Sequence, residues 1–83
     1  MTYDESPTEI QYQHCKKAME ILRSNVKDPK IDMAGVDDAY RNCEENGATP
    51  WNVAQLRLTI IRLNATRGYD DFCPLDEVTA LFD

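Results

Sequence analysis

Apolar residues recur along the chain at the spacing of α-helices rather than in the alternation of strands. In residues 7–26 they fall on one half of a helical wheel, opposite most charged residues; they are Ile10, Cys15, Ala18, Met19, Ile21, Leu22 and Val26. The run Ser6-Pro7-Thr8-Glu9 has the form of a capping box, with Ser6 at the N-cap. The pattern therefore predicts an amphipathic helix over residues 7–26.

A second apolar repeat begins after residues 27–30, which break the first run at a proline. Its members are spaced by three or four residues, as one face of a helix requires; they are Met33, Val36, Tyr40 and Cys43. Asp32 can cap this helix, and Asn46-Gly47 is a common stop signal. We expect a helix over residues 33–46.

Residues 50–66 carry apolar positions on two sides of a predicted helix. One stripe contains Val53, Leu56, Ile60 and Leu63, and the other contains Trp51, Ala54, Leu58, Ile61 and Ala65. Thr49-Pro50 supplies an N-cap residue followed by a proline in the first turn. Two apolar sides predict a central helix with two neighbours, which lie either in the same chain or in a second copy.

A last apolar group predicts a short helix over residues 74–82, starting at Cys73-Pro74; its members are Leu75, Val78, Leu81 and Phe82. A helix of this length is not stable alone and must dock on the others. The sequence therefore predicts an all-α fold, a compact bundle of three main helices plus a short C-terminal helix. We expect a single domain over residues 1–83, with a flexible N-terminal tail at residues 1–6.

Composition narrows the classes of function. The 83 residues include 9 basic and 15 acidic side chains, for a net charge of −6 at pH 7. This acidity argues against direct binding to nucleic acid or to an anionic membrane, and no apolar run approaches the roughly 18 residues of a spanning helix. Because common catalytic and phosphate-binding motifs are missing from so short a sequence, we expect no enzymatic activity and no cofactor.

Acidic side chains gather in two segments. One group shares a face of the predicted helix 33–46, and the other crowds the C-terminal segment; they are Asp37, Asp38, Glu44 and Glu45, and Asp70, Asp71, Asp76 and Glu77. Carboxylates one to two helical turns apart lie about 5–11 Å from each other, comparable to successive nucleic-acid phosphates. We therefore expect a non-enzymatic protein-binding factor, such as a phage or mobile-element inhibitor that occupies the basic, nucleic-acid-binding surface of a host protein complex. The competing interpretation is a solvated face that keeps the protein in solution.

Two other functions stay open. A helical dimerising adaptor or transcriptional regulator would use the second apolar stripe, with Trp51, Leu58 and Ile61 as the dimer face. A helix-turn-helix DNA-binding protein would use the three arginines of the C-terminal half, which are Arg57, Arg62 and Arg67. The acidic residues of helix 33–46 disfavour this last hypothesis, because they would lie close to phosphates.

Cys15, Cys43 and Cys73 are separated by 28 and 30 residues, which matches no zinc-binding spacing. An odd number of cysteines cannot form a complete disulfide framework, so we expect a reducing, cytoplasmic location. His14 is adjacent to Cys15, but neighbouring residues on a helix point about 100° apart. We therefore expect these side chains to pack in the core rather than bind a metal. Asn64-Ala65-Thr66 has the form of a glycosylation sequon, which has no meaning in the cytoplasm.

Overall fold

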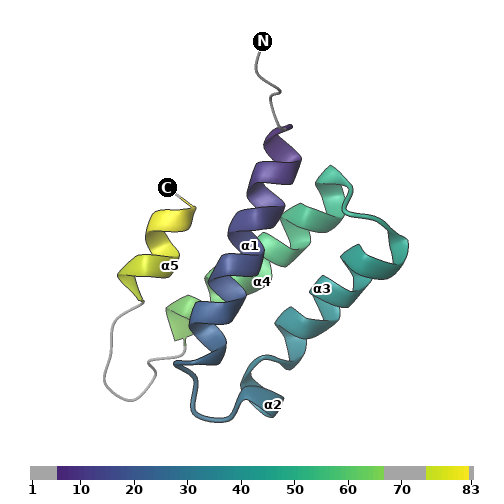
Figure 1. Ribbon diagram of the computed structural model, residues 1–83. Coiled ribbons are helices and arrows are strands. Elements are labelled where there is room, and N and C mark those ends of the chain that lie inside the picture. The colour runs from purple at the N-terminus through teal and green to yellow at the C-terminus, as the bar shows by residue number, and fades with distance from the viewer. Residues whose placement is uncertain (1–5, 67–74, 83) are drawn as a thin grey trace.

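Five helices follow one another in the computed structural model, which describes residues 6–66 and 75–82 (Figure 1). They are α1 (Pro7–Arg23), α2 (Pro29–Asp32), α3 (Ala34–Asn46), α4 (Pro50–Thr66) and α5 (Asp76–Leu81). No strand occurs in the described part of the chain. The all-α fold expected from the sequence is confirmed. Apart from Ser6, the predicted N-terminal tail lies outside the described residues.

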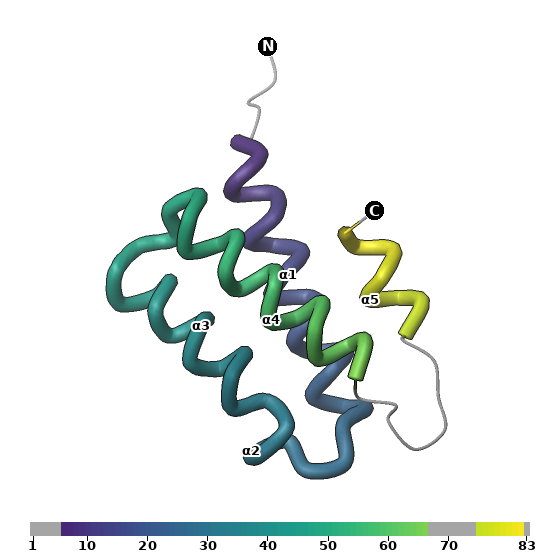
Figure 2. Tube along the Cα trace, turned by 180° about the vertical axis from the view of Figure 1, so that it is seen from behind, coloured from purple at the N-terminus to yellow at the C-terminus, as the bar shows by residue number. Residues whose placement is uncertain are grey.

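α4 is the central helix of the bundle. It packs against both α3 and α1, and these two helices also meet through side chains that reach from one to the other. α5 lies against α1 and α4, and α2 packs on the start of α3. Seen from behind, α4 crosses the molecule between α3 and α5 and leaves one of its sides facing outward (Figure 2). α4 is thus a central helix with neighbours in its own chain, and the alternative of a further neighbour in a second copy stays a prediction.

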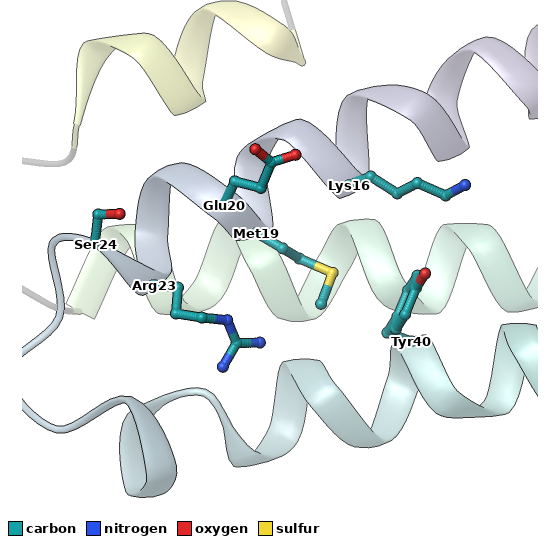
Figure 3. A pocket seen from close by; sticks show the side chains of 6 residues that line it. All are labelled: Lys16, Met19, Glu20, Arg23, Ser24 and Tyr40. Carbon is teal, nitrogen blue, oxygen red and sulfur yellow. The ribbon is translucent and has the colours of Figure 1, made fainter.

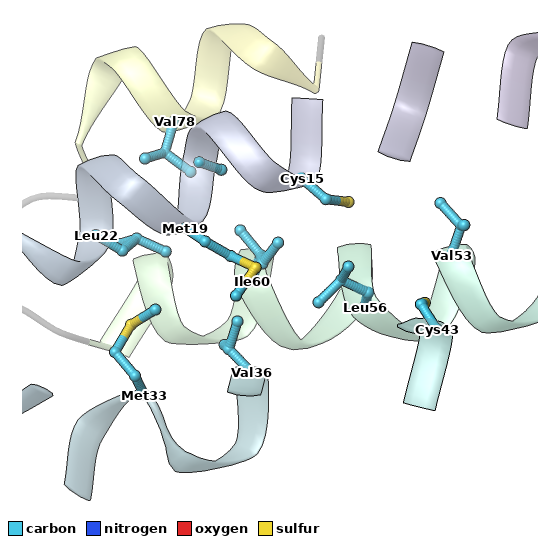
Figure 4. Packing of buried hydrophobic residues seen from close by; sticks show 11 residues of the cluster. Cys15, Met19, Leu22, Met33, Val36, Cys43, Val53, Leu56, Ile60 and Val78 are labelled. Atoms are coloured by element: carbon cyan, nitrogen blue, oxygen red, sulfur yellow. The ribbon is translucent and has the colours of Figure 1, made fainter. Parts of the chain in front are cut away.

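The core is assembled from one face of each long helix, together with one valine of α5 (Figure 4). Its buried members are Cys15, Ala18, Met19, Leu22, Met33, Val36, Cys43, Val53, Leu56, Ile60 and Val78. They include the first apolar stripe predicted for residues 50–66, except that Leu63 is only partly buried. Cys15 and Cys43 pack as small apolar side chains, as expected.

Local capping signals set the helix starts that the sequence predicted. The Ser6 hydroxyl accepts a hydrogen bond from the Glu9 amide at 3.1 Å, and the Thr49 hydroxyl accepts one from the Asn52 amide at 3.1 Å. Each bond satisfies an amide that has no partner within its own helix. α4 spans the expected residues 50–66, whereas α1 stops at Arg23, earlier than the expected residue 26.

The segment before α3 differs from the prediction. Residues 29–32 form the short helix α2, and Asp28 caps it by accepting a hydrogen bond from the Lys30 amide at 3.2 Å. Asp32 is the last residue of α2 and accepts from the Asp28 amide at 2.9 Å, so it is not the N-cap of α3. Met33 takes that position without a side-chain cap, because its side chain is fully buried in the core.

α5 is held in place by a polar side chain of α4. Asn64 is only 5% exposed, and its Oδ1 accepts a hydrogen bond from the Leu75 amide at 2.9 Å. Its Nδ2 lies 3.3 Å from the Thr79 hydroxyl and donates to it. Asn64 therefore caps α5 from a neighbouring helix. A side chain buried in this way is inconsistent with glycosylation at the Asn64-Ala65-Thr66 motif. The predicted Cys73-Pro74 start lies outside the described residues.

Candidate protein-interaction surfaces

One side of α4 is left uncovered by the rest of the described chain. We define the α4 outer face as its exposed residues on this side: Trp51, Ala54, Gln55, Leu58 and Arg62. Trp51 is 72% exposed and Leu58 is 40% exposed. At 1.5 Å per residue, the face is about 16 Å long from Trp51 to Arg62. The α4 outer face is a narrow strip with two large apolar side chains.

The predicted dimer face is divided by α5. Trp51 and Leu58 lie together on the α4 outer face, but Ile61 is half-buried on the side that faces α5. There Ile61 lines a crevice of about 190 Å³ with Asn64, Val78, Thr79 and Phe82. The second apolar stripe of residues 50–66 is therefore partly covered within the chain, and Ile61 belongs to the contact with α5.

α4 carries two charged side chains, and both are cationic. The Arg57 guanidinium lies over the Phe82 ring, with Cζ 5.7 Å from the ring centroid, so it is held against α5. Arg62 is exposed and makes no ion pair with any described residue. The outer face thus combines an indole, a leucine and an exposed guanidinium, which are side chains that suit protein contacts.

On the opposite side of the molecule, a groove runs between α1 and α3 (Figure 3). Its main depression has a volume of about 530 Å³ and is lined by Lys16, Met19, Glu20, Arg23, Ser24 and Tyr40. Met19 is almost fully buried, whereas the α1 residues beside it present charges of both signs. The groove is therefore open and lined mainly by residues that carry a polar or charged group, unlike the apolar clefts that enclose small ligands.

An aromatic cluster crosses this groove at one end. The Tyr12 and Tyr40 rings are stacked with centroids 6.1 Å apart, and the Lys16 ammonium lies 4.7 Å from the Tyr12 centroid. The Tyr12 hydroxyl donates a hydrogen bond to Glu44. Burial and this bond raise the pKa of Tyr12, so its hydroxyl stays protonated and joins α1 to α3.

The four acidic residues of α3 have different surroundings. Asp37 is half-buried and pairs with Arg23 of α1, with 2.6 Å between Oδ1 and Nη2. Asp38 pairs with Arg41 on α3 at 3.3 Å, and Glu44 accepts the bond from Tyr12. The side chains therefore do not form one uniform acidic patch, because two of them connect α3 to α1.

Three further acidic residues are exposed in the described chain. Glu45 lies in the last turn of α3, and Asp76 and Glu77 lie in the first turn of α5. The remaining two predicted partner-binding residues, Asp70 and Asp71, lie outside the described residues. The described structure thus separates the two acidic groups onto different helices and leaves Asp38 and Glu45 as the acidic residues of α3 that are not bonded to α1.

The cysteines lie in surroundings that suppress thiol chemistry. Burial raises the pKa of the Cys15 thiol to about 12, and it also raises the pKa of Cys43. Both thiols are free and stay protonated at neutral pH, which makes them poor nucleophiles and poor metal ligands. Cys73 lies outside the described residues, and His14 is half-buried on α1. No group of three or more His, Cys, Asp or Glu side chains in the described part of the chain could hold a metal ion.

Comparison of the chain with protein-family models, with curated proteins and with solved structures gives no match. None of the described helices has both the length and the apolar character needed to cross a bilayer. The function of the chain is therefore inferred from the surfaces described above.

Proposed function

We propose that this chain is a small, non-enzymatic, cytoplasmic protein-binding factor that binds its partner through the α4 outer face. The observation that carries the proposal is the exposure of Trp51 and Leu58 on a helix whose opposite side is fully buried. Tryptophan and arginine are enriched among the residues that dominate binding energy, and the outer face contains both. Burying the exposed part of Trp51 would contribute on the order of 4 kcal/mol.

The test is capture of a partner with an intact and an altered outer face. We expect Leu58→Asp to abolish capture of a partner from a lysate of the cells in which the protein occurs, because it places a charge in the centre of the contact. The matched control is Ile31→Asp, which changes another exposed apolar residue, 71% exposed on α2. Circular dichroism on both variants confirms that the helices are retained. Capture that survives Leu58→Asp would reject the α4 outer face as the binding site.

A second candidate function uses the acidic end of α3. Two carboxylates, Glu44 and Glu45, lie in the last turn of α3, which contains no basic residue. The helix macrodipole disfavours negative charge there by about 0.3–1 kcal/mol per exposed group. The bond from Tyr12 offsets this for Glu44 but not for Glu45. This observation favours a basic partner, such as the nucleic-acid-binding surface of a host protein that an inhibitor would occupy.

The two candidates are separated by charge reversal on α3. In the double variant Asp38→Lys and Glu45→Lys, both changed side chains are exposed, and the two residues that connect α3 to α1 are kept. We expect a basic partner to be lost in this variant and to be released from the native protein by salt. The control is the exposed α1 pair Glu9→Lys and Glu20→Lys. Equal loss in both double variants would reject a specific acidic site.

A further inference from the structure

The α4 outer face lies in the one long segment of this acidic chain that has no carboxylate. All 15 acidic residues fall at or before Glu45 or at or after Asp70, so residues 46–69 contain none. At physiological ionic strength, exposed charges are screened beyond about 8 Å, so nearby charges outweigh the net charge of the molecule. α4 itself therefore carries only positive charge, although the whole chain carries −6.

The shape of the outer face fits a second helix laid along α4. Trp51, Ala54 and Leu58 are spaced by three and four residues, which places them in one stripe along the helix. Ala54 is small and lies between two large side chains, which leaves space for an apolar side chain of a partner. In Figure 2, α4 runs between α3 and α5 with one of its sides outward. A helix of three to four turns would match the length of the exposed strip.

The charges select the chemistry of that helix. Arg62 is exposed without an ion-pair partner among the described residues, whereas Arg57 is held against Phe82 of α5. A second copy of α4 would supply no carboxylate to Arg62, because α4 has none. A carboxylate next to an apolar residue on a partner helix would instead pair with Arg62.

We infer that the α4 outer face takes an amphipathic helix of a partner protein in which carboxylates flank the apolar stripe. This inference rests on the proposed function, which assigns protein binding to the same face. The partner's apolar residues cover Trp51 and Leu58 and fill the space above Ala54. Its carboxylates pair with Arg62.

Trp51 is the only tryptophan of the chain, so its emission reports directly on this face. The probe is a synthetic helical peptide of about 18 residues with a leucine stripe flanked by glutamates, and its matched control carries lysines in place of the glutamates. We expect the glutamate peptide to shift Trp51 emission to shorter wavelength and to bind about tenfold more tightly than the lysine peptide. Arg62→Glu should reverse this preference, whereas Lys17→Glu, an equal charge change at an exposed position of α1, should leave it intact.

Each contrary result has a distinct meaning. Equal affinity for both peptides, or a preference that Arg62→Glu does not change, would overturn the acidic-partner inference while leaving protein binding by α4 in place. A dimer in sedimentation that Leu58→Asp converts to a monomer would also overturn it, because the face would then bind a second copy. Absence of any Trp51 response to either peptide, together with partner capture that survives Leu58→Asp, would remove the inference and the proposed function together.

Discussion

Asn64 is a single side chain that sets the position of a helix. Its amide group combines an acceptor, which takes the Leu75 amide proton, with a donor, which reaches the Thr79 hydroxyl. An aspartate would lack the donor and a leucine would lack both groups. Because α5 has only 6 residues, this cap and the burial of Val78 hold it on the bundle.

Replacement of Asn64 tests this role. We expect Asn64→Ala to lower the free energy of unfolding by about 1–3 kcal/mol, because the Leu75 amide would lose its partner in a partly buried site. Urea denaturation followed by circular dichroism measures the change. Gln55→Ala, an exposed amide on the same helix, is the control and should change stability by less than about 0.5 kcal/mol. Equal effects of the two variants would contradict the capping role.

At the scale of elements, the two described glycines act in opposite ways. Gly47 ends α3 with φ of 104°, the only positive φ in the described chain, and its amide donates to the Cys43 carbonyl at 3.0 Å. A residue with Cβ is strained in that conformation. Gly35 lies in the first turn of α3, where a Cβ atom added to it would have no neighbouring atom within 4 Å. Gly35 therefore lowers the stability of α3, although no neighbouring atom requires a residue without a Cβ atom at this position.

Alanine at these two positions should have effects of opposite sign. Gly47→Ala should destabilise the protein by about 1–2 kcal/mol, since it forces a positive φ on alanine. Gly35→Ala should stabilise it by about 0.5–1 kcal/mol, because it lowers the entropy of the unfolded chain and meets open space. Thermal unfolding of both variants measures the difference. A Gly47→Ala protein as stable as the native chain would show that the α3–α4 turn tolerates another conformation.

At the scale of the whole molecule, the packing of three helices decides which side of α4 becomes core. Leu56 is fully buried between α1 and α3, whereas Leu58, two positions later, is 40% exposed on the outer face. α5 then covers Ile61 and stops short of Leu58. The exposed strip is thus a product of how the helices are arranged rather than of α4 itself.

Leu56 and Leu58 allow a comparison of a buried and an exposed leucine on the same helix. Leu56→Ala should cost about 2–5 kcal/mol of unfolding free energy, as expected for a cavity in a close-packed core. Leu58→Ala should cost less than about 1 kcal/mol, because Leu58 is 40% exposed and its removal opens no enclosed cavity. Urea midpoints of the two variants check this. Similar losses for both would mean that Leu58 is covered in solution, for example by a second copy.

The helices and most of the core could be predicted from the amino-acid sequence. Helical periodicity and the capping residues Ser6 and Thr49 act within a few residues of the chain, so the start of α1 and both ends of α4 follow from local patterns. The prediction that Asp32 caps α3 was wrong because it also rested on a local pattern. The buried side chain of Met33 takes the N-cap position of α3, and this burial depends on distant helices.

The candidate sites, in contrast, depend on how the helices pack. The sequence placed Asp37 and Glu44 on one face of a helix, but their contacts with Arg23 and Tyr12 arise because α1 lies across from α3. No spacing along the chain marks Asn64 as a cap for a residue 11 positions later. Periodicity shows that a side of a helix is apolar, whereas exposure depends on which neighbour covers that side. For the α4 outer face, no described part of the chain does.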